Sequence, residues 1–324
     1  MTFPVSARGR GSWLVVRKTL SRRREPALAV ASFVLPLVVW SALSYLPFLW
    51  HPYVKITHPG DGEYAVGARV ERATFAEEVR RAQAAGGAAP RGVAVNPVYF
   101  PAPHEVAEAL YTAFLTPPRL PTEPWLHESL WHSLQVIFWG FLLSSIVGIP
   151  LGILGGTFSF FSKLTEPFIE FFRYLPAPAF GALGVAVLGI YDAPKIAIIF
   201  IGTFFQMVLM FAEDVRRVPM TQIEAAQTMG ATRGEIVNLV LIPSAKPALL
   251  DTLRVTMGWA WTYLVVAELV AANSGLGYAI LRAQRFLQTD KIFAGIIIIG
   301  LIGLILDQLF RWLHRAAFPW LHKR

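Results

Sequence analysis

Long apolar runs alternate with polar segments along this chain of 324 residues. Within each run the apolar residues are continuous, so the pattern favours buried or lipid-facing helices over half-buried strands. A helix crosses the hydrocarbon core of a bilayer with about 20 mostly apolar residues. We therefore expect six transmembrane helices, at residues 27–50, 134–155, 175–190, 196–212, 248–272 and 292–313.

Two of these runs have special features. The third run has Pro176 and Pro178 near its start, and proline kinks or breaks a helix because it lacks an N–H group. The first run is longer than the roughly 7–15 residues of a signal-peptide core. We expect a kink in the third helix, and we expect the first helix to be retained as a membrane span.

Composition agrees with a membrane protein that crosses the bilayer several times. Hydrophobic residues make up 55% of the chain, charged residues 15%, and the mean hydropathy is +0.50. The chain has no cysteine, which excludes disulfides and thiolate metal sites. With the N-terminus inside, the inside segments hold sixteen Lys and Arg and the short outside segments hold four. This bias predicts cytoplasmic termini, so we read the net charge of +8 as a topology signal and expect no nucleic-acid partner.

The predicted spans divide the chain into five parts: a basic cytoplasmic tail at 1–26, the first helix at 27–50, a long periplasmic loop or small cap at 51–126, a core at 127–313 and a cytoplasmic tail at 314–324. In the periplasmic part, residues 58–71 predict a hairpin and residues 101–114 an amphipathic helix. Residues 73–85 predict a helix with Thr74 as its N-cap, in a capping box with Glu77. Glu77 and Arg81 have the i,i+4 spacing of an ion pair.

The core is interrupted by a polar loop at 213–247, which reads as two short helices separated by a glycine. Two pairs have capping-box spacing: Thr221 with Glu224, and Thr232 with Glu235. Gly230 lies between them and suits the left-handed residue that ends a helix. We expect Pro243 and Pro247 to end the second helix before the fifth span.

The first of these short helices has features of a docking surface. Ile223, Ala226 and Met229 recur at every third position and form a narrow apolar ridge. Ala225 and Ala226 have small side chains, so a partner could approach the helix backbone closely. The alternative is that Glu224 only caps its own helix and the ridge only packs on neighbouring spans.

The spacing in this loop also resembles a known signature. Glu224-Ala225-Ala226 is followed after three residues by Gly230 and after nine more by Val240-Leu241-Ile242-Pro243. This resembles the EAA motif of permease subunits in binding-protein-dependent ABC importers. From about Pro101 onward the chain is similar to the nitrate, sulfonate, taurine and bicarbonate branch, especially its taurine and aliphatic-sulfonate permeases. Residues 54–95 depart from that family, whose first outer loop is usually shorter.

The resemblance implies an all-α membrane protein of six helices with the type I importer permease fold, in the bacterial inner membrane. It implies a homodimer, two ABC ATPase subunits that bind ATP and Mg²⁺, and a periplasmic binding protein that delivers a small anionic solute. In that family the EAA segment couples the permease to the ATPase, which assigns this role to Glu224, Ala225, Ala226, Gly230 and Pro243. We find no G-x-x-x-x-G-K-[ST] phosphate loop in the sequence. We therefore expect no enzymatic activity, no bound cofactor and no metal in this chain.

Ionisable residues inside predicted spans are further candidates, because charge in a membrane is costly and often functional. Glu268 in the fifth span, with Asn273 just after it, could line or gate the pathway; Glu268 could equally join two helices. A bare carboxylate does not favour an anion, so we expect a structural or gating role for Glu268 over direct contact. For Asp307 we expect a structural role.

Two other classes of protein fit parts of the sequence. An ATP-independent secondary transporter or channel would need ion-coupling groups such as Glu268 and Asp307. An intramembrane hydrolase could use His127, Glu128 and His132, which resemble a zinc motif only loosely. The two histidines are five residues apart and point in different directions on a helix, so we favour interface residues over a zinc site.

Overall fold

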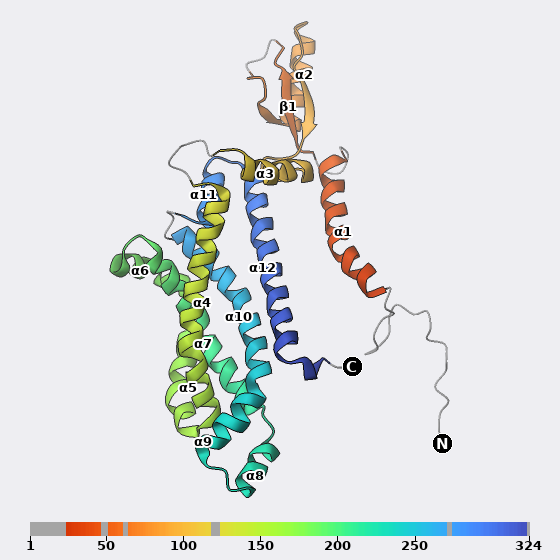
Figure 1. Ribbon diagram of the computed structural model, residues 1–324. Coiled ribbons are helices and arrows are strands. Elements are labelled where there is room, and N and C mark those ends of the chain that lie inside the picture. The colour runs from red at the N-terminus through yellow and green to blue at the C-terminus, as the bar shows by residue number, and fades with distance from the viewer. Residues whose placement is uncertain (1–23, 47–50, 61–63, 118–123, 271–273, 323–324) are drawn as a thin grey trace, which may run out of the picture. The chain divides into compact units, whose positions relative to one another are not determined.

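The computed structural model describes residues 24–46, 51–60, 64–117, 124–270 and 274–322 (Figure 1). The chain divides into two compact units, Met1–Val106 and Ala107–Arg324. The first unit contains one long helix and a small sheet, and the second contains the remaining long helices and the polar loop.

The first unit begins with helix α1 (Arg24–Tyr45), which is followed by a three-stranded antiparallel sheet of order β2-β1-β3. The strands are β1 (Tyr53–His58), β2 (Arg69–Glu71) and β3 (Arg91–Val95). Strands β1 and β2 pair as an antiparallel hairpin, but β1 lies before the predicted range of 58–71 and shares only His58 with it. Val54 and Ile56, alternate residues of β1, are both buried, so one face of the sheet is covered.

Helix α2 (Arg72–Ala84) contacts this sheet and corrects one prediction. Its N-cap is Glu71, in extended conformation, and not Thr74. The strand β2 ends at Glu71 and leads directly into the helix, so the chain direction is set by the sheet before Thr74 is reached. The predicted pair of Glu77 and Arg81 is present at 3.8 Å, and both side chains are largely exposed. Helix α3 (Pro103–Leu115) confirms the second predicted helix.

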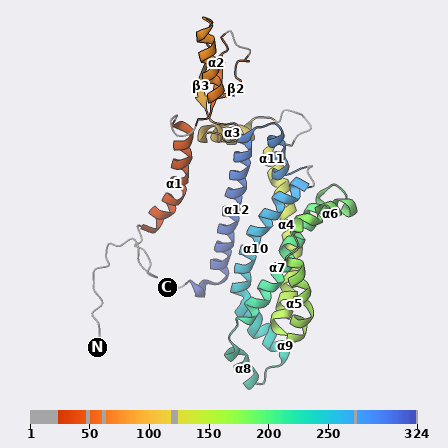
Figure 2. The ribbon, with the colours of Figure 1, turned by 180° about the vertical axis from the view of Figure 1, so that it is seen from behind.

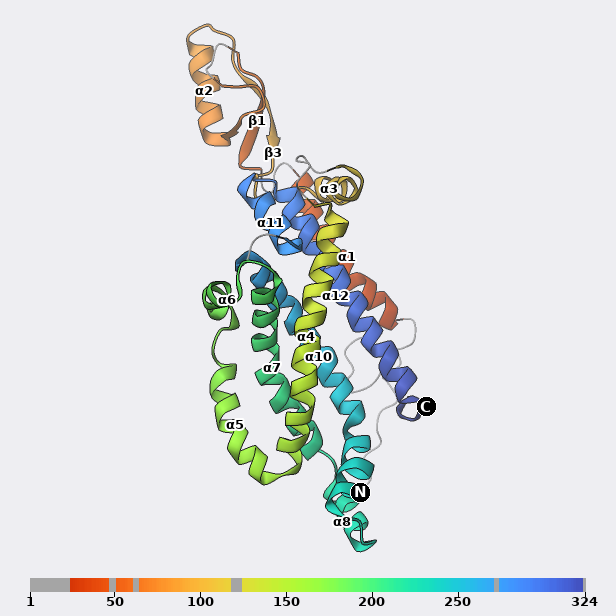
Figure 3. The same cartoon turned by 60° about the vertical axis from the view of Figure 1, so that its left-hand side comes forward.

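Four long helices form the frame of the second unit: α4 (Leu126–Thr157), α7 (Asp192–Arg216), α10 (Ile242–Val270) and α12 (Thr289–Ala317). Together with α1 they make five described helices that are long and apolar enough to cross a membrane. Helices α4 and α7 run side by side, as Figure 3 shows. The membrane part is therefore helical, as predicted, and the predicted spans at 134–155, 196–212 and 292–313 lie inside the longer helices α4, α7 and α12.

The third predicted span is wrong as a single helix. Residues 175–190 form only the 3-10 turn η1 (Ala177–Phe180) and the short helix α6 (Gly181–Leu188). Residues assigned to the cytoplasm form helix α5 (Ser159–Arg173), and α5 and η1–α6 meet at 84°. The break coincides with Pro176 and Pro178, since proline disfavours helical conformation in the residue before it. This bent pair could count as a sixth span.

Glycines bring α4 and α7 into close contact. A Cβ atom at Gly140 would lie 2.7 Å from the Ile199 side chain, and one at Gly156 would lie 2.6 Å from the carbonyl oxygen of Ala212. In the same interface the hydroxyls of Ser144 and Thr203 are 2.7 Å apart. Small residues allow helices in membranes to approach closely and to form hydrogen bonds between them.

One apolar core connects the frame with the polar loop. Its buried members include Val136 of α4, Phe211 of α7 and Leu249 of α10, together with Ala226 of the loop. Partly buried residues of α12, such as Ile302, pack against the same core. The polar loop therefore packs against the helices of the second unit.

Candidate functional site

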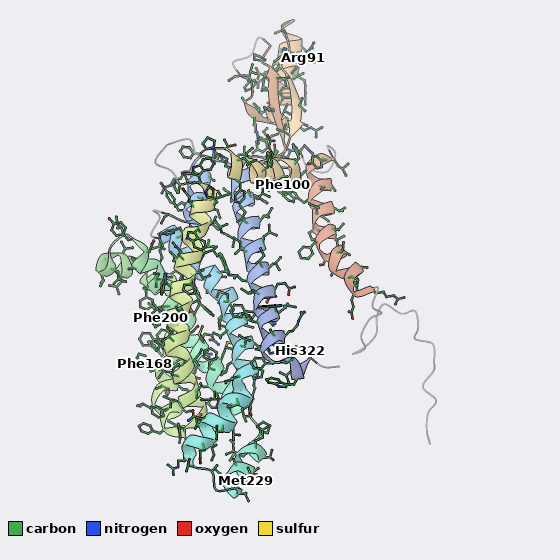
Figure 4. All side chains as sticks on the ribbon, viewed as in Figure 1. Arg91, Phe100, Phe168, Phe200, Met229 and His322 are labelled. Carbon is green, nitrogen blue, oxygen red and sulfur yellow. The ribbon has the colours of Figure 1, made fainter. Side chains whose placement is uncertain are left out.

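The polar loop forms one end of the second unit (Figures 1 and 2). It contains α8 (Met220–Thr228), a turn at Gly230, the short helix α9 (Arg233–Glu235) and a π-helical segment, η2 (Ile236–Leu241). Figure 4 places the side chain of Met229 at the tip of this loop, and it is 82% exposed. The predicted arrangement of helix, glycine turn and helix is confirmed.

The start of α8 differs from the prediction. Pro219 occupies the N-cap position, and Thr221 lies inside the helix and does not cap it. Proline fixes its own φ near the value that a helix entry needs, so the helix begins before Thr221. Among the residues that the structure describes, no hydrogen-bond donor contacts the carboxylate of Glu224 within the chain, and this residue is exposed. Glu224 is therefore not a capping residue.

Gly230 ends α8 in the way the sequence predicts. Its φ is +86°, and its N–H donates to the carbonyl of Gln227 at 2.9 Å. The next N–H, of Ala231, donates to the carbonyl of Ala226 at 3.0 Å. These two bonds are the Schellman motif, which favours glycine at the left-handed position. A Cβ at Gly230 would meet no atom within 4 Å, so backbone conformation alone, without any steric contact, favours glycine.

The three residues of the predicted apolar ridge of α8 do not all face the same way: two pack against the core and one is exposed. Ala226 is buried, and Ile223 packs against the same core. Ala225 and Met229 are exposed. The core thus binds one side of α8, because α7, η2 and α10 meet there and offer apolar contacts. Ala226 packs within the chain, and the exposed face of α8 consists of Glu224, Ala225 and Met229.

The second half of the loop confirms one prediction and corrects another. Thr232 and Glu235 form the predicted capping box, with Thr232 N–H donating to Glu235 Oε2 at 2.7 Å. Pro243 and Pro247 do not end the helix, since η2 continues directly into α10 and α10 contains both. The π-helical segment ends at Leu241, two residues before Pro243, and single π-helical turns are known to interrupt otherwise continuous α-helices. Burial of Leu241, among other residues of this stretch, stabilises the continuous helix.

A second candidate site, around Glu268 of α10, lies near the opposite end of α7 from the loop. Glu268 is fully buried. Its Oε1 accepts a hydrogen bond from the Ser133 hydroxyl of α4 at 2.5 Å, and its Oε2 accepts one from Gly277 N–H at 2.6 Å. The oxygen of Ser133 accepts a bond from Leu276 N–H at 2.9 Å. The two side chains thus bind the N-terminus of α11 (Leu276–Arg285) and join three helices.

A charged cluster adjoins this site. Lys195 of α7 is fully buried, and its Nζ donates to the hydroxyl of Ser274 at 2.8 Å and to Asp192 Oδ1 at 3.2 Å. His132 Nε2 lies 2.9 Å from Asp192 Oδ2. Helix α7 begins at Asp192 and so includes Lys195, which the sequence pattern placed in the segment just before this helix. Ser133 and Lys195 each lie one residue before a predicted apolar run, so their local sequence does not distinguish them from ordinary residues that flank a membrane span.

The remaining sequence candidates are placed as follows. Glu128 caps its own helix, since its Oε2 accepts a bond from Trp125 N–H at 2.8 Å. In the described part of the chain, no three His, Cys, Asp or Glu residues form a group that could hold a metal ion. Asp307 lies 2.7 Å from Arg311 Nε on α12 and 3.5 Å from Arg254 Nε on α10. Asn273 falls outside the described residues.

Comparison with known proteins decides the family. Residues 148–318, which include the whole polar loop, match the family of binding-protein-dependent transport system inner membrane components. The chain belongs to this family. A probable ABC transporter permease protein of Brucella melitensis is 34% identical over 227 residues, covering 70% of this chain and 89% of the relative. The taurine transport system permease protein TauC of Escherichia coli is 34% identical over 226 residues, covering 70% and 82%.

The fold of this permease agrees with the family. It resembles a chain of the MetNI methionine ABC transporter in an inward-facing conformation, with a TM-score of 0.53 and 20% identity. The similarity covers 59% of the permease and 95% of that chain. The permease is thus an inner-membrane transport subunit of an ABC importer, without enzymatic activity of its own, and the family works with an ATPase and a binding protein. The predicted family, fold class and importer function are confirmed.

Proposed function

We propose that two copies of the permease form the pathway of an ATP-driven importer, and that the loop of each copy docks on one of two ATPase subunits. The observation that carries this proposal is the exposed face of Glu224, Ala225 and Met229, on a helix whose opposite side is bound to the core through Ala226. A helix that is anchored on one side and open on the other can both bind a partner and transmit its motion. ATP and Mg²⁺ bind to the ATPase chains.

The contacts of α8 support a mechanical role. Ala226 shares the apolar core with Val215 at the end of α7 and with Ala245 near the start of α10. The Ser244 hydroxyl of α10 donates to Gln222 Oε1 of α8 at 3.0 Å. A displacement of α8 therefore moves the adjacent ends of α7 and α10. On this proposal, ATPase closure opens the pathway outward and hydrolysis resets it.

The proposed orientation places the loop and both termini in the cytoplasm and residues 51–126 in the periplasm. Even without Arg173 and Lys195, one from each side, the segments on the proposed cytoplasmic side hold fifteen Lys and Arg and the short segments on the other side hold three. Lipid surrounds the apolar helices, and the solute-binding protein docks on the periplasmic side.

The names of relatives support a small anion as the solute. Besides TauC, a putative aliphatic sulfonates transport permease protein SsuC of Bacillus subtilis is 36% identical over 185 residues, covering 56% of the permease and 66% of that relative. A nitrate import permease protein NrtB of Synechocystis is 27% identical over 221 residues. A sulfonate, taurine, nitrate or related organic anion is the proposed cargo.

Purification of the tagged permease from its native membranes in mild detergent, followed by mass spectrometry, tests the proposal. We expect an ABC ATPase in near-equal amount, because each permease copy carries one loop. A permease that purifies without an ATPase in several mild detergents would contradict the proposal and favour an ATP-independent carrier.

A further inference from the structure

An elongated groove runs along the face formed by α5, α7 and α10. One part of it is a cavity of about 330 Å³, whose lining includes Arg173, Gln206, Trp259, Thr262 and Tyr263. An adjoining cavity of about 440 Å³ shares Arg173 and Gln206 with the first. Its other lining residues include Arg217, which follows the end of α7 that leads to the polar loop. The groove thus extends from the middle of α7 to its loop end.

Arg173 is the last residue of α5 and lines the same cavity as Gln206, which lies near the middle of α7. At 1.5 Å per residue, Gln206 lies about 21 Å from the start of α7 and about 15 Å from its end at Arg216. Helix α5 starts beside that same end, since Arg216 contacts both Ser162 and Glu166 of α5. The 15 residues of α5 then carry Arg173 about 22 Å away from it. Both lengths place Arg173 well away from the loop end of α7, toward the middle of that helix.

The groove itself leaves this guanidinium without a carboxylate partner. Arg173 Nη2 donates to the Tyr174 hydroxyl at 2.9 Å, and its Nε is buried without a hydrogen-bond acceptor among the described residues. The acidic residues that line the groove bind other groups. Glu213 lies 3.4 Å from Arg217, and Asp214 Oδ2 accepts a bond from the Thr252 hydroxyl at 2.5 Å.

The third lining carboxylate, Asp251, lies 3.5 Å from Arg254, which also pairs with Asp307. A guanidinium has five N–H donors in a planar fork that matches carboxylate and other oxyanions. Charged groups at membrane depth face cavities and mark the pathways of ions and substrates. An anion in the groove would neutralise Arg173 and satisfy its free donors.

We propose that Arg173 binds the anionic head group of the transported solute, and that the adjoining aromatic side chains bind an apolar body. This inference rests on the importer function proposed above and narrows the solute to a small organic anion. The amide of Gln206 and the hydroxyl of Thr262 line the same cavity and supply further polar contacts. Phe172, Trp259 and Tyr263 give it apolar walls, which a carbon-bearing sulfonate or carboxylate uses and nitrate does not.

Uptake by cells whose own copy is replaced by variants tests this site, with ethanesulfonate and nitrate as the labelled probes. We expect Arg173→Gln to lower ethanesulfonate uptake at least tenfold, because the charge and most donors are lost. Arg173→Lys keeps the charge without the planar fork, so we expect an intermediate rate. The matched control is Lys163→Gln, which removes an exposed cation from the same helix and is expected to leave uptake unchanged.

Two accompanying measurements separate a binding role from a structural one. The amount of ATPase that copurifies with Arg173→Gln should equal that of the wild type, and so should the oligomeric mass. Loss of either would show that Arg173 joins subunits and would overturn the proposal. Uptake at the wild-type rate by the Arg173→Gln variant would also overturn the proposal that Arg173 binds the solute. Faster import of nitrate than of ethanesulfonate by the wild type would overturn the assignment of an organic solute.

Vanadate sensitivity and copurification of the ATPase distinguish failure of the importer function from failure of the role of Arg173. If wild-type uptake is insensitive to vanadate and no ATPase copurifies, the importer function fails and the proposal for Arg173 fails with it. If uptake is vanadate-sensitive and Arg173→Gln is unaffected, only the role of Arg173 is refuted.

Discussion

Ser133 on α4 and Glu268 on α10 are joined by a hydrogen bond of 2.5 Å, although 135 residues separate them in the sequence. Each of the two side chains also accepts a backbone N–H of α11. The pair is therefore the joint at which three helices meet. This geometry explains a buried carboxylate without any role in solute contact.

Removal of the Ser133 hydroxyl tests this joint. In Ser133→Ala, the N–H of Leu276 and one oxygen of Glu268 lose their partner in a buried place. An unsatisfied buried polar group costs about 1–3 kcal/mol, so we expect the free energy of unfolding to fall by that amount. Thermal unfolding in detergent measures it. Ser32→Ala is the control, since the Ser32 hydroxyl is exposed and bonds only within α1; equal stability of both variants would contradict the joint.

Gly275 is expected to tolerate no side chain. Its φ is +99°, and a Cβ there would collide with the carboxylate of Glu268. Backbone strain of this kind costs about 1–3 kcal/mol, so Gly275→Ala should lower thermal stability measurably. Gly258→Ala on α10 is the matched control, because a Cβ at Gly258 meets no atom within 4 Å. Unchanged stability of Gly275→Ala would show that α11 starts differently.

Gly230 is expected to be essential for coupling. Gly230→Val forces a β-branched residue into a left-handed conformation, which costs an ordinary residue about 1–2 kcal/mol. The turn should then rearrange and uptake should fall at least tenfold, with normal amounts of permease in the membrane. Gly234→Val is the control, since Gly234 is equally open but has no positive φ. Immunoblots measure the amount of permease in the membrane, and uptake assays measure its transport rate. Uptake at the wild-type rate by Gly230→Val would contradict the coupling role of Gly230.

The two alanines of the loop should respond in opposite ways to a large side chain. Ala225 is exposed, so Ala225→Phe should leave thermal stability unchanged and abolish copurification of the ATPase. Ala226 is buried in the core, and overpacking there costs about 1–3 kcal/mol, so Ala226→Phe should lower stability. If Ala225→Phe still binds the ATPase in full amount, the exposed face of α8 is not the docking surface.

Local sequence determined much of this protein. Five apolar runs predict five long helices, because about 20 apolar residues are enough to specify a span whatever surrounds them. Gly230 and the box of Thr232 and Glu235 predict the turn and the helix start after it, since both depend on backbone groups within a few residues. The EAA spacing pointed to the importer family, which the comparisons confirm.

Tertiary structure alone decided the rest. Whether Ala225 or Ala226 faces outward depends on where α7 and α10 lie, and the two residues look alike in the sequence. Lys195 reads as a flanking charge until Ser274, 79 residues later, is brought within 2.8 Å of it. The break after Arg173 sets that side chain in a groove whose other walls come from α7 and α10. The reason is common to all three cases: burial and pairing are properties of contacts between distant segments, and helical periodicity carries no information about which segments meet.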